Sequence, residues 1–140
     1  MNGKPFADTN VLIYAIASHG PEAKKSARAN AVLRAGTVCL STQVLGEFYR
    51  AVTSPRRAVP LSHEQALVWV QLWKRHEVRD ITVAHVDLAL EVCDRFQVNY
   101  YDALILATAR LAGCQVVISE DLKHGQDYGG VRVENPFRER

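Results

Sequence analysis

The sequence predicts a three-layer α/β/α domain built on a mostly parallel central sheet of about five strands. Short apolar runs alternate with longer segments of helical periodicity, and this alternation is typical of a parallel sheet with helices on its faces. The chain has 140 residues, of which 48% are hydrophobic and 23% charged, as in an ordinary globular protein. We therefore expect a single domain over residues 1–140.

Five apolar runs are the candidate strands, and each ends beside a polar residue. They are Lys4–Ala7, Thr37–Leu40, Val78–Ile81, Gln115–Ile118 and Val131–Val133. Two helices are expected between successive strands up to the fourth, so the predicted order is β-α-α-β-α-α-β-α-α-β-β. Right-handed crossovers would make this a doubly wound sheet.

Most of the helices are marked by residues that favour helix ends. The segments with helical spacing are 21–36, 41–55, 61–76, 83–96 and 102–113. Pro21 and Gly36 stand where the first of these helices would begin and end. Ser62 is the expected cap of the third, and Gly113 should terminate the last. The last helix is apolar on nearly every side and is therefore expected to be buried.

Four acidic side chains are expected at one edge of this sheet. Asp8 directly follows the first strand, Asp121 follows the fourth, and Glu47 lies in the helix after the second. Asp102 opens the helix that leads into the fourth strand. That helix runs antiparallel to its strand, so its amino terminus lies at the edge where the strand's carboxyl end lies. Four carboxylates from four segments are therefore expected to converge on one pocket.

The predicted acidic pocket needs something to offset its charge. Two like charges about 4 Å apart repel by roughly 4 kcal/mol at a surface-like dielectric, so either the pKa values rise or a cation is present. Oxygen ligands without cysteine or histidine suit Mg²⁺ or Mn²⁺. Taken singly, Asp8 and Asp102 also fit helix caps, and Glu47 fits a solvated helix charge. The metal hypothesis therefore depends on the four acids together.

Four segments around these acids resemble the motifs of PIN-domain nucleases, most closely the VapC-type toxins of bacterial toxin-antitoxin pairs. The segments read FADTNVLIYA, STQVLGEFYRAV, YYDALILATA and ISEDLKHGQ, and the resemblance extends over almost the whole chain. It implies an Mg²⁺- or Mn²⁺-dependent endoribonuclease that hydrolyses RNA phosphodiester bonds. In that case Asp8, Glu47, Asp102 and Asp121 would surround the metal.

The resemblance also implies roles for individual side chains. Asp8 and Asp102 would be the direct metal ligands, and Glu47 and Asp121 would act partly through water. Small polar neighbours would orient the carboxylates by hydrogen bonds, as is usual around metal ligands. These neighbours are Thr9, Asn10 and Ser119.

Asp121 has an acidic neighbour, Glu120, and a histidine follows at position 124. Adjacent side chains at a strand end point in opposite directions, so only one of the two acids is expected in the pocket. Asp121 is chosen because the family's pattern is serine or threonine, any residue, then aspartate. His124 stands close enough to approach the pocket, but a surface position is expected, since no second histidine lies at ligand spacing.

Basic residues must flank an acidic pocket that binds a phosphate backbone. Arg56 and Arg57 are the best candidates, since they lie in the loop beyond the Glu47 helix, and Arg50 is a weaker one. The net charge of +2 is uninformative about nucleic acid.

We expect a cytoplasmic protein without membrane attachment. The longest apolar stretches are too short to cross a bilayer, and three isolated cysteines favour reduced core residues over disulfides. The resemblance implies a homodimer and a cognate antitoxin that occupies an apolar groove. The helix that carries Trp69 and Trp73 is a candidate wall of this groove, although core packing explains the two tryptophans more simply.

Other functions stay open on the sequence alone. The main alternative is a catalytically silent PIN-like module that binds RNA or protein, and the complete set of four acids argues against it. An aspartyl-phosphate phosphatase would need a second aspartate where Asn10 stands. A dinucleotide-binding domain would need a GxGxxG motif after the first strand, and the sequence has none there.

Overall fold

Five parallel strands form one sheet in the order β3-β2-β1-β4-β5 in the computed structural model, which describes residues 3–138. The strands are β1 (Phe6–Ala7), β2 (Cys39–Ser41), β3 (Glu77–Arg79), β4 (Val116–Ile118) and β5 (Arg132–Glu134). Each pair of neighbouring strands is parallel. The predicted fold class and the predicted order of strands and α-helices are confirmed, and the strand ends differ by one or two residues.

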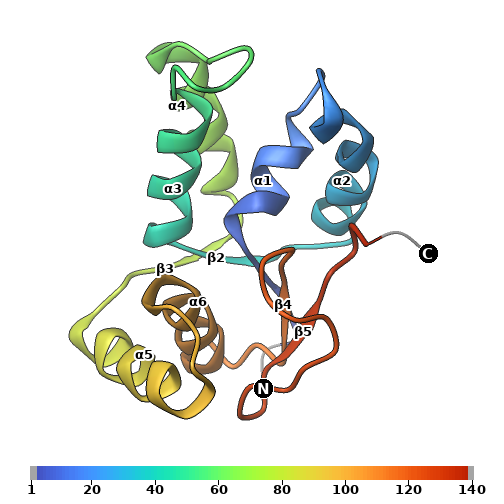
Figure 1. The fold of residues 1–140 in the computed structure, drawn as a ribbon. Coiled ribbons are helices and arrows are strands. Elements are labelled where there is room, and N and C mark those ends of the chain that lie inside the picture. Colours follow the sequence, from blue (N-terminus) through green and yellow to red (C-terminus); the bar gives the residue numbers. More distant parts are fainter. Residues whose placement is uncertain (1–2, 139–140) are drawn as a thin grey trace.

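Helices cover both faces of the sheet and complete three layers (Figure 1). On one face lie α1 (Thr9–Ala15), the short 3₁₀ helix η1 (Pro21–Lys25), α2 (Ser26–Arg34), α3 (Thr42–Val52) and α4 (His63–Trp73). On the other face lie α5 (Val83–Phe96) and α6 (Tyr100–Leu111). None of the helices within residues 3–138 combines the length and the apolar character needed to cross a membrane.

The helix predicted over residues 21–36 is divided in two. Pro21 opens η1 rather than an α-helix, and α2 follows from Ser26 and ends at Arg34. A tight 3₁₀ turn is common at the start of a helix, where backbone groups lack partners four residues away. The predicted cap of α4 is confirmed, because the Ser62 side chain and Gln65 exchange hydrogen bonds with each other's backbone.

The core lies between the sheet and the two helix layers. In α6 every residue from 103 to 109 is buried, which confirms the burial predicted from its apolar sequence. On the opposite face Phe48 of α3 packs edge-on against Trp73 of α4, with ring centroids 5.8 Å apart. Trp73 is 5% exposed, and the Trp69 ring stacks on it with ring centroids 5.5 Å apart, so these two tryptophans serve core packing.

The strand order reverses direction at β1, which has β2 on one side and β4 on the other. In such sheets a crevice opens beyond the carboxyl ends of the strands at this point, and ligands bind there. Ala7 pairs with Ile118, so the residues that follow them, Asp8 and Ser119, lie next to each other at that crevice.

Candidate active site

Asp8 leaves β1 and caps α1 at the crevice. Its backbone N–H donates to the Ile118 carbonyl at 2.9 Å, which extends the β1–β4 pairing by one residue. Its carboxylate accepts two hydrogen bonds, from the Thr9 backbone N–H and from the Ser119 hydroxyl, both at 2.7 Å. Because these contacts use both oxygens, the side chain has a fixed orientation while serving as a helix cap.

The Asp8 carboxylate is nearly removed from water and lies among like charges. Only 5% of the residue is exposed. Burial raises the pKa of Asp8 to about 6, the charges of Asp121 and Glu47 act in the same direction, and the two hydrogen bonds oppose them. At neutral pH the carboxylate is therefore ionised at a cost, and a nearby cation would be favoured.

The Glu47 side chain extends from α3 to the crevice where Asp8 lies. Ser41 caps this helix by accepting from the Val44 N–H at 3.2 Å. Val44 and Phe48 are buried beneath the helix, so Glu47 lies beside the buried face and not on it. Its Oε1 accepts a hydrogen bond from the Thr9 hydroxyl at 2.8 Å, which links α3 to the residue that follows Asp8.

Asp102 comes from the first turn of α6, across the sheet from α3. Asn99 caps this helix and exchanges two hydrogen bonds with Asp102, from the Asp102 N–H at 3.0 Å and to the Asp102 Oδ2 at 2.7 Å. Burial raises the pKa of Asp102, and the charges of Asp121 and Glu47 raise it further, whereas the Asn99 contact lowers it. Two of the four acids thus have raised pKa values for the same physical reasons.

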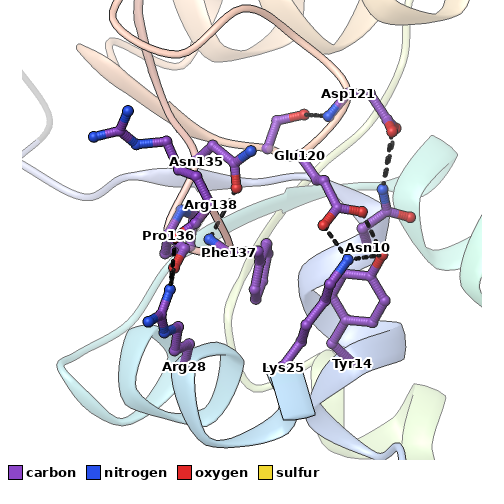
Figure 2. Close-up of polar contacts among 11 residues, drawn as sticks. Asn10, Tyr14, Lys25, Arg28, Glu120, Asp121, Asn135, Pro136, Phe137 and Arg138 are labelled. Carbon is purple, nitrogen blue, oxygen red and sulfur yellow. Dashed lines mark hydrogen bonds and ion pairs between the residues drawn. The ribbon is translucent and has the colours of Figure 1, made fainter. Parts of the chain in front are cut away.

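Asp121 completes the set from the loop after β4. The Asn10 amide donates to its two oxygens at 3.2 and 3.1 Å, and its own N–H donates to the Ser119 hydroxyl oxygen at 3.1 Å. Ser119 therefore connects Asp8 to the Asp121 backbone through one oxygen. Figure 2 shows that the neighbouring Glu120 contacts Tyr14 and Lys25 instead.

These four acids line one pocket of about 370 Å³. Its lining residues come from α1, α3, α6 and the loops next to them. They are Asp8, Thr9, Asn10, Gln43, Glu47, Arg50, Ala51, Ser54, Tyr101, Asp102, Ile105 and Asp121. The charged groups of this lining are four carboxylates and one guanidinium, so the pocket is strongly acidic and rich in oxygen ligands.

The pocket is not a preformed metal cage. Within residues 3–138, no three Asp, Glu, His or Cys side chains stand in an arrangement that would hold a metal ion. Mg²⁺ keeps several of its waters and usually takes only one or two protein carboxylates. The donor chemistry of the pocket suits such a hydrated ion, because carboxylate, hydroxyl and amide oxygens line it and neither histidine nor cysteine does.

The other residues singled out in the sequence are divided between this pocket and two other cavities. Arg50 lines the acidic pocket. Arg56 and Arg57 instead line a separate cavity of about 490 Å³ beside the segment 16–22. His124 accepts a hydrogen bond from the Asn135 N–H at 3.0 Å and lines a third cavity, which does not include the four acids.

The sequence did not predict the roles of two pocket-lining residues, Gln43 and Tyr101, or of Asn99, which forms hydrogen bonds with Asp102. Gln43 donates to the Tyr101 carbonyl at 3.3 Å and so joins α3 to α6, and its buried Oε1 has no hydrogen-bond partner within the described chain. Tyr101 beside it is 63% exposed. Asn99 had a usable signal, because an asparagine three residues before an acid has capping-box spacing. Gln43 and Tyr101 had none, since only the tertiary fold brings them together.

Comparisons with known proteins agree with this architecture. The family model described as PIN domain matches residues 6–126. A toxin-antitoxin complex from Klebsiella pneumoniae contains a chain with 18% identity and a TM-score of 0.73, with 96% of this chain and 98% of that chain covered. DNA-bound VapBC from Salmonella typhimurium shares 24% identity at a TM-score of 0.65, with 96% and 99% covered.

A further similar structure is VapC20 from Mycobacterium tuberculosis, described as a Sarcin-Ricin loop cleaving toxin. It shares 21% identity at a TM-score of 0.67, with 84% of this chain and 90% of that chain covered. A comparison with curated protein sequences gives no match. At these identities the solved structures show a common fold, and the family match covers most of the sequence. The chain belongs to the PIN domain family.

Proposed function

We propose that this chain is a metal-dependent endoribonuclease and the toxin of a type II toxin-antitoxin pair. The observation that carries the proposal is the convergence of four carboxylates from four separate segments on one pocket. Burial and mutual repulsion raise the pKa values of two of them, Asp8 and Asp102. A bound cation would offset the cost of keeping these charges together.

Asp8 and Asp102 are the proposed direct ligands of the cation. Glu47 and Asp121 would hold water molecules of its hydration shell, which fits the lack of a three-ligand cage among residues 3–138. The hydrogen bonds of Thr9, Asn10 and Ser119 fix the directions of the carboxylates. We propose Mg²⁺ or Mn²⁺, because the donors are oxygens.

The reaction we propose is hydrolysis of an RNA phosphodiester by water. A bound divalent cation would supply Lewis-acid activation and would offset the charge that develops on the phosphate. The chain's own carboxylates would orient the attacking water. Because water attacks and the 3′-oxygen leaves, the products would carry a 5′-phosphate and a 3′-hydroxyl.

The partner we propose is an antitoxin, because similar structures are toxin-antitoxin complexes. A homodimer and a cytoplasmic location belong to the same proposal, and the three cysteines, all within residues 3–138, are free thiols. Trp73 is buried, so it offers no surface to a partner. On the same helix Leu67 and Val68 are 43% and 69% exposed, and they are the better apolar contacts for an antitoxin or a second copy.

Replacing Asp8 by asparagine tests the nuclease proposal. Asp8→Asn keeps the shape and the helix cap but removes one charge, so we expect Mn²⁺-dependent cleavage of a mixed RNA pool to fall by about 100-fold or more. The control is Asp87→Asn, an exposed aspartate on α5 outside the pocket, which should cleave as the parent does. Mass spectrometry of the products should find 5′-phosphates; 2′,3′-cyclic phosphates, or full activity of Asp8→Asn, would refute the proposal.

The same variant should be more stable than the parent when metal is removed by EDTA. The folded-state pKa of Asp8 is about 6 against a usual 3.8, so folding favours the protonated form. Stability is therefore lost as the pH rises from about 4 through 6, by about 3 kcal/mol in all. Asp8→Asn has no carboxyl group to ionise at this position, so its stability does not fall in this way as the pH rises. Urea unfolding at pH 4.5 and pH 8 should show its advantage growing with pH; an advantage independent of pH would contradict this account.

The three arginines are proposed to contact the RNA backbone. Arg50 lies in the acidic pocket, and Arg57 Nη1 is shielded from water without a hydrogen-bond partner in the described chain. Each phosphate contact that is lost should reduce the slope of log affinity against log salt by about 0.7 for single strands. We expect this reduction for Arg50→Ala, and about twice as much for the double variant of Arg56 and Arg57.

Binding is measured in EDTA so that the RNA stays intact. Arg34→Ala is the matched control, because Arg34 is exposed at the end of α2 and lines neither cavity. A variant whose slope of log affinity against log salt is unchanged would show that its arginine does not contact the RNA. A similar reduction of the slope in Arg34→Ala would show that only net charge matters.

A further inference from the structure

Glu120 does not line the acidic pocket, and its carboxylate contacts two residues of other segments. Its Oε1 accepts a hydrogen bond from the Tyr14 hydroxyl of α1, and its Oε2 forms an ion pair with Lys25 Nζ of η1 (Figure 2). Lys25 Nζ also lies 3.4 Å from the Tyr14 hydroxyl oxygen and 4.7 Å from the centre of the ring. We call Tyr14, Lys25 and Glu120 the Glu120 clamp.

Helix α1 holds both residues of the adjacent pair, Glu120 and Asp121. Asn10 donates to the Asp121 carboxylate at 3.2 and 3.1 Å, and Tyr14, one turn later, donates to Glu120 (Figure 2). Residues four apart lie on the same face of a helix. Two consecutive residues after β4 are therefore tied to one face of α1.

The C-terminal segment covers the clamp. Phe137 is 7% exposed and packs edge-on against the Tyr14 ring, with centroids 4.9 Å apart. Arg28 of α2 donates to the Pro136 and Arg138 carbonyls, both at 2.9 Å, and so holds the segment in place (Figure 2). The clamp is therefore partly shielded from water, where an ion pair is stronger than at an open surface.

The protonation states of the clamp suit its contacts. The hydrogen bond to Glu120 raises the pKa of Lys25, so the ammonium stays charged at neutral pH. Burial, and then the hydrogen bond to Glu120, raises the pKa of Tyr14 to about 12, so its hydroxyl remains a donor. The Glu120 carboxylate thus forms an ion pair with the Lys25 ammonium and accepts a hydrogen bond from the neutral Tyr14 hydroxyl.

We propose that the Glu120 clamp positions Asp121 in the pocket, with Lys25 and Glu120 as positioning residues; this inference rests on the nuclease function proposed above. Asp121 is exposed, and three other carboxylates share its pocket, so repulsion favours its movement outward. The clamp anchors the backbone next to it. This anchor keeps Asp121 within reach of Asn10, where it can help to bind a hydrated cation.

The test removes the lysine charge and measures metal binding directly. Mn²⁺ is titrated by calorimetry into the full chain, and kcat and KM for RNA are measured separately. Lys25→Met should weaken Mn²⁺ binding by about tenfold and lower kcat at limiting Mn²⁺, with KM for RNA unchanged. Lys25→Arg, which keeps the charge, should restore most of the affinity. Tyr14→Phe, which removes one hydrogen bond, should have a smaller effect in the same direction.

Lys24→Met is the matched control, because Lys24 is the exposed neighbour of Lys25 and has no side-chain partner within residues 3–138. It loses the same charge and should bind Mn²⁺ as the parent does. The double variant with Glu120→Gln and Lys25→Met should bind Mn²⁺ no more weakly than the weaker-binding single variant, because both substitutions break the same ion pair. If Lys25→Met fails to fold, Glu120→Gln and Tyr14→Phe give the same comparison in a folded chain.

The outcomes separate this inference from the proposed function. Parental Mn²⁺ affinity and kcat in folded Lys25→Met and Glu120→Gln, with Asp121→Asn inactive, would overturn the clamp's role and leave the nuclease proposal intact. An equal loss of Mn²⁺ affinity in Lys24→Met would also overturn it, because net charge would then explain the effect. If Asp121→Asn and Asp8→Asn cleave as the parent does, the nuclease proposal itself is wrong.

Discussion

Repulsion among four carboxylates is the constraint to which the rest of this structure responds. Asp8, Glu47, Asp102 and Asp121 come from different segments, and their shared pocket contains a single guanidinium, that of Arg50. Hydrogen bonds hold each acid in place, but they do not remove the charge. Burial raises the pKa of Asp8 to about 6, and the charges of Asp121 and Glu47 act in the same direction. A divalent cation is the simplest partner that offsets the repulsion and gives the arrangement a use.

The fold brings these acids together by using positions that it needs for other reasons. Asp8 caps α1, Asn99 and Asp102 form the start of α6, and Ser119 continues β4. All of them lie where the strand order reverses, which is where a parallel sheet opens a crevice. Helix starts add unpaired N–H groups that favour negative side chains. Structure and proposed function therefore depend on the same few residues, so the site is difficult to change without affecting stability.

Much of the fold was predictable because it follows from local patterns. Five apolar runs became five strands, and α6 is buried as its apolar sequence indicates. The four acids were predictable as a group, because parallel topology brings strand ends to one edge. The division of the helix after Pro21 was not, since 3₁₀ and α turns share the same residue preferences.

Side-chain partners far apart in the sequence were the least predictable part. The contact of Gln43 with the Tyr101 carbonyl joins segments 58 residues apart, and that of Lys25 with Glu120 joins segments 95 apart. Arg56 and Arg57 line a cavity separate from the acidic pocket, because packing with the rest of the fold sets the direction of their loop.

The most direct test is an experimental crystal structure of the chain grown with saturating Mn²⁺, with the anomalous signal of manganese used to locate the ion. The account predicts a peak in the pocket, with Asp8 and Asp102 as its protein ligands and waters between it and the other two acids. Manganese bound only outside the pocket, or a pocket in which the four carboxylates remain apart without any ion, would contradict it.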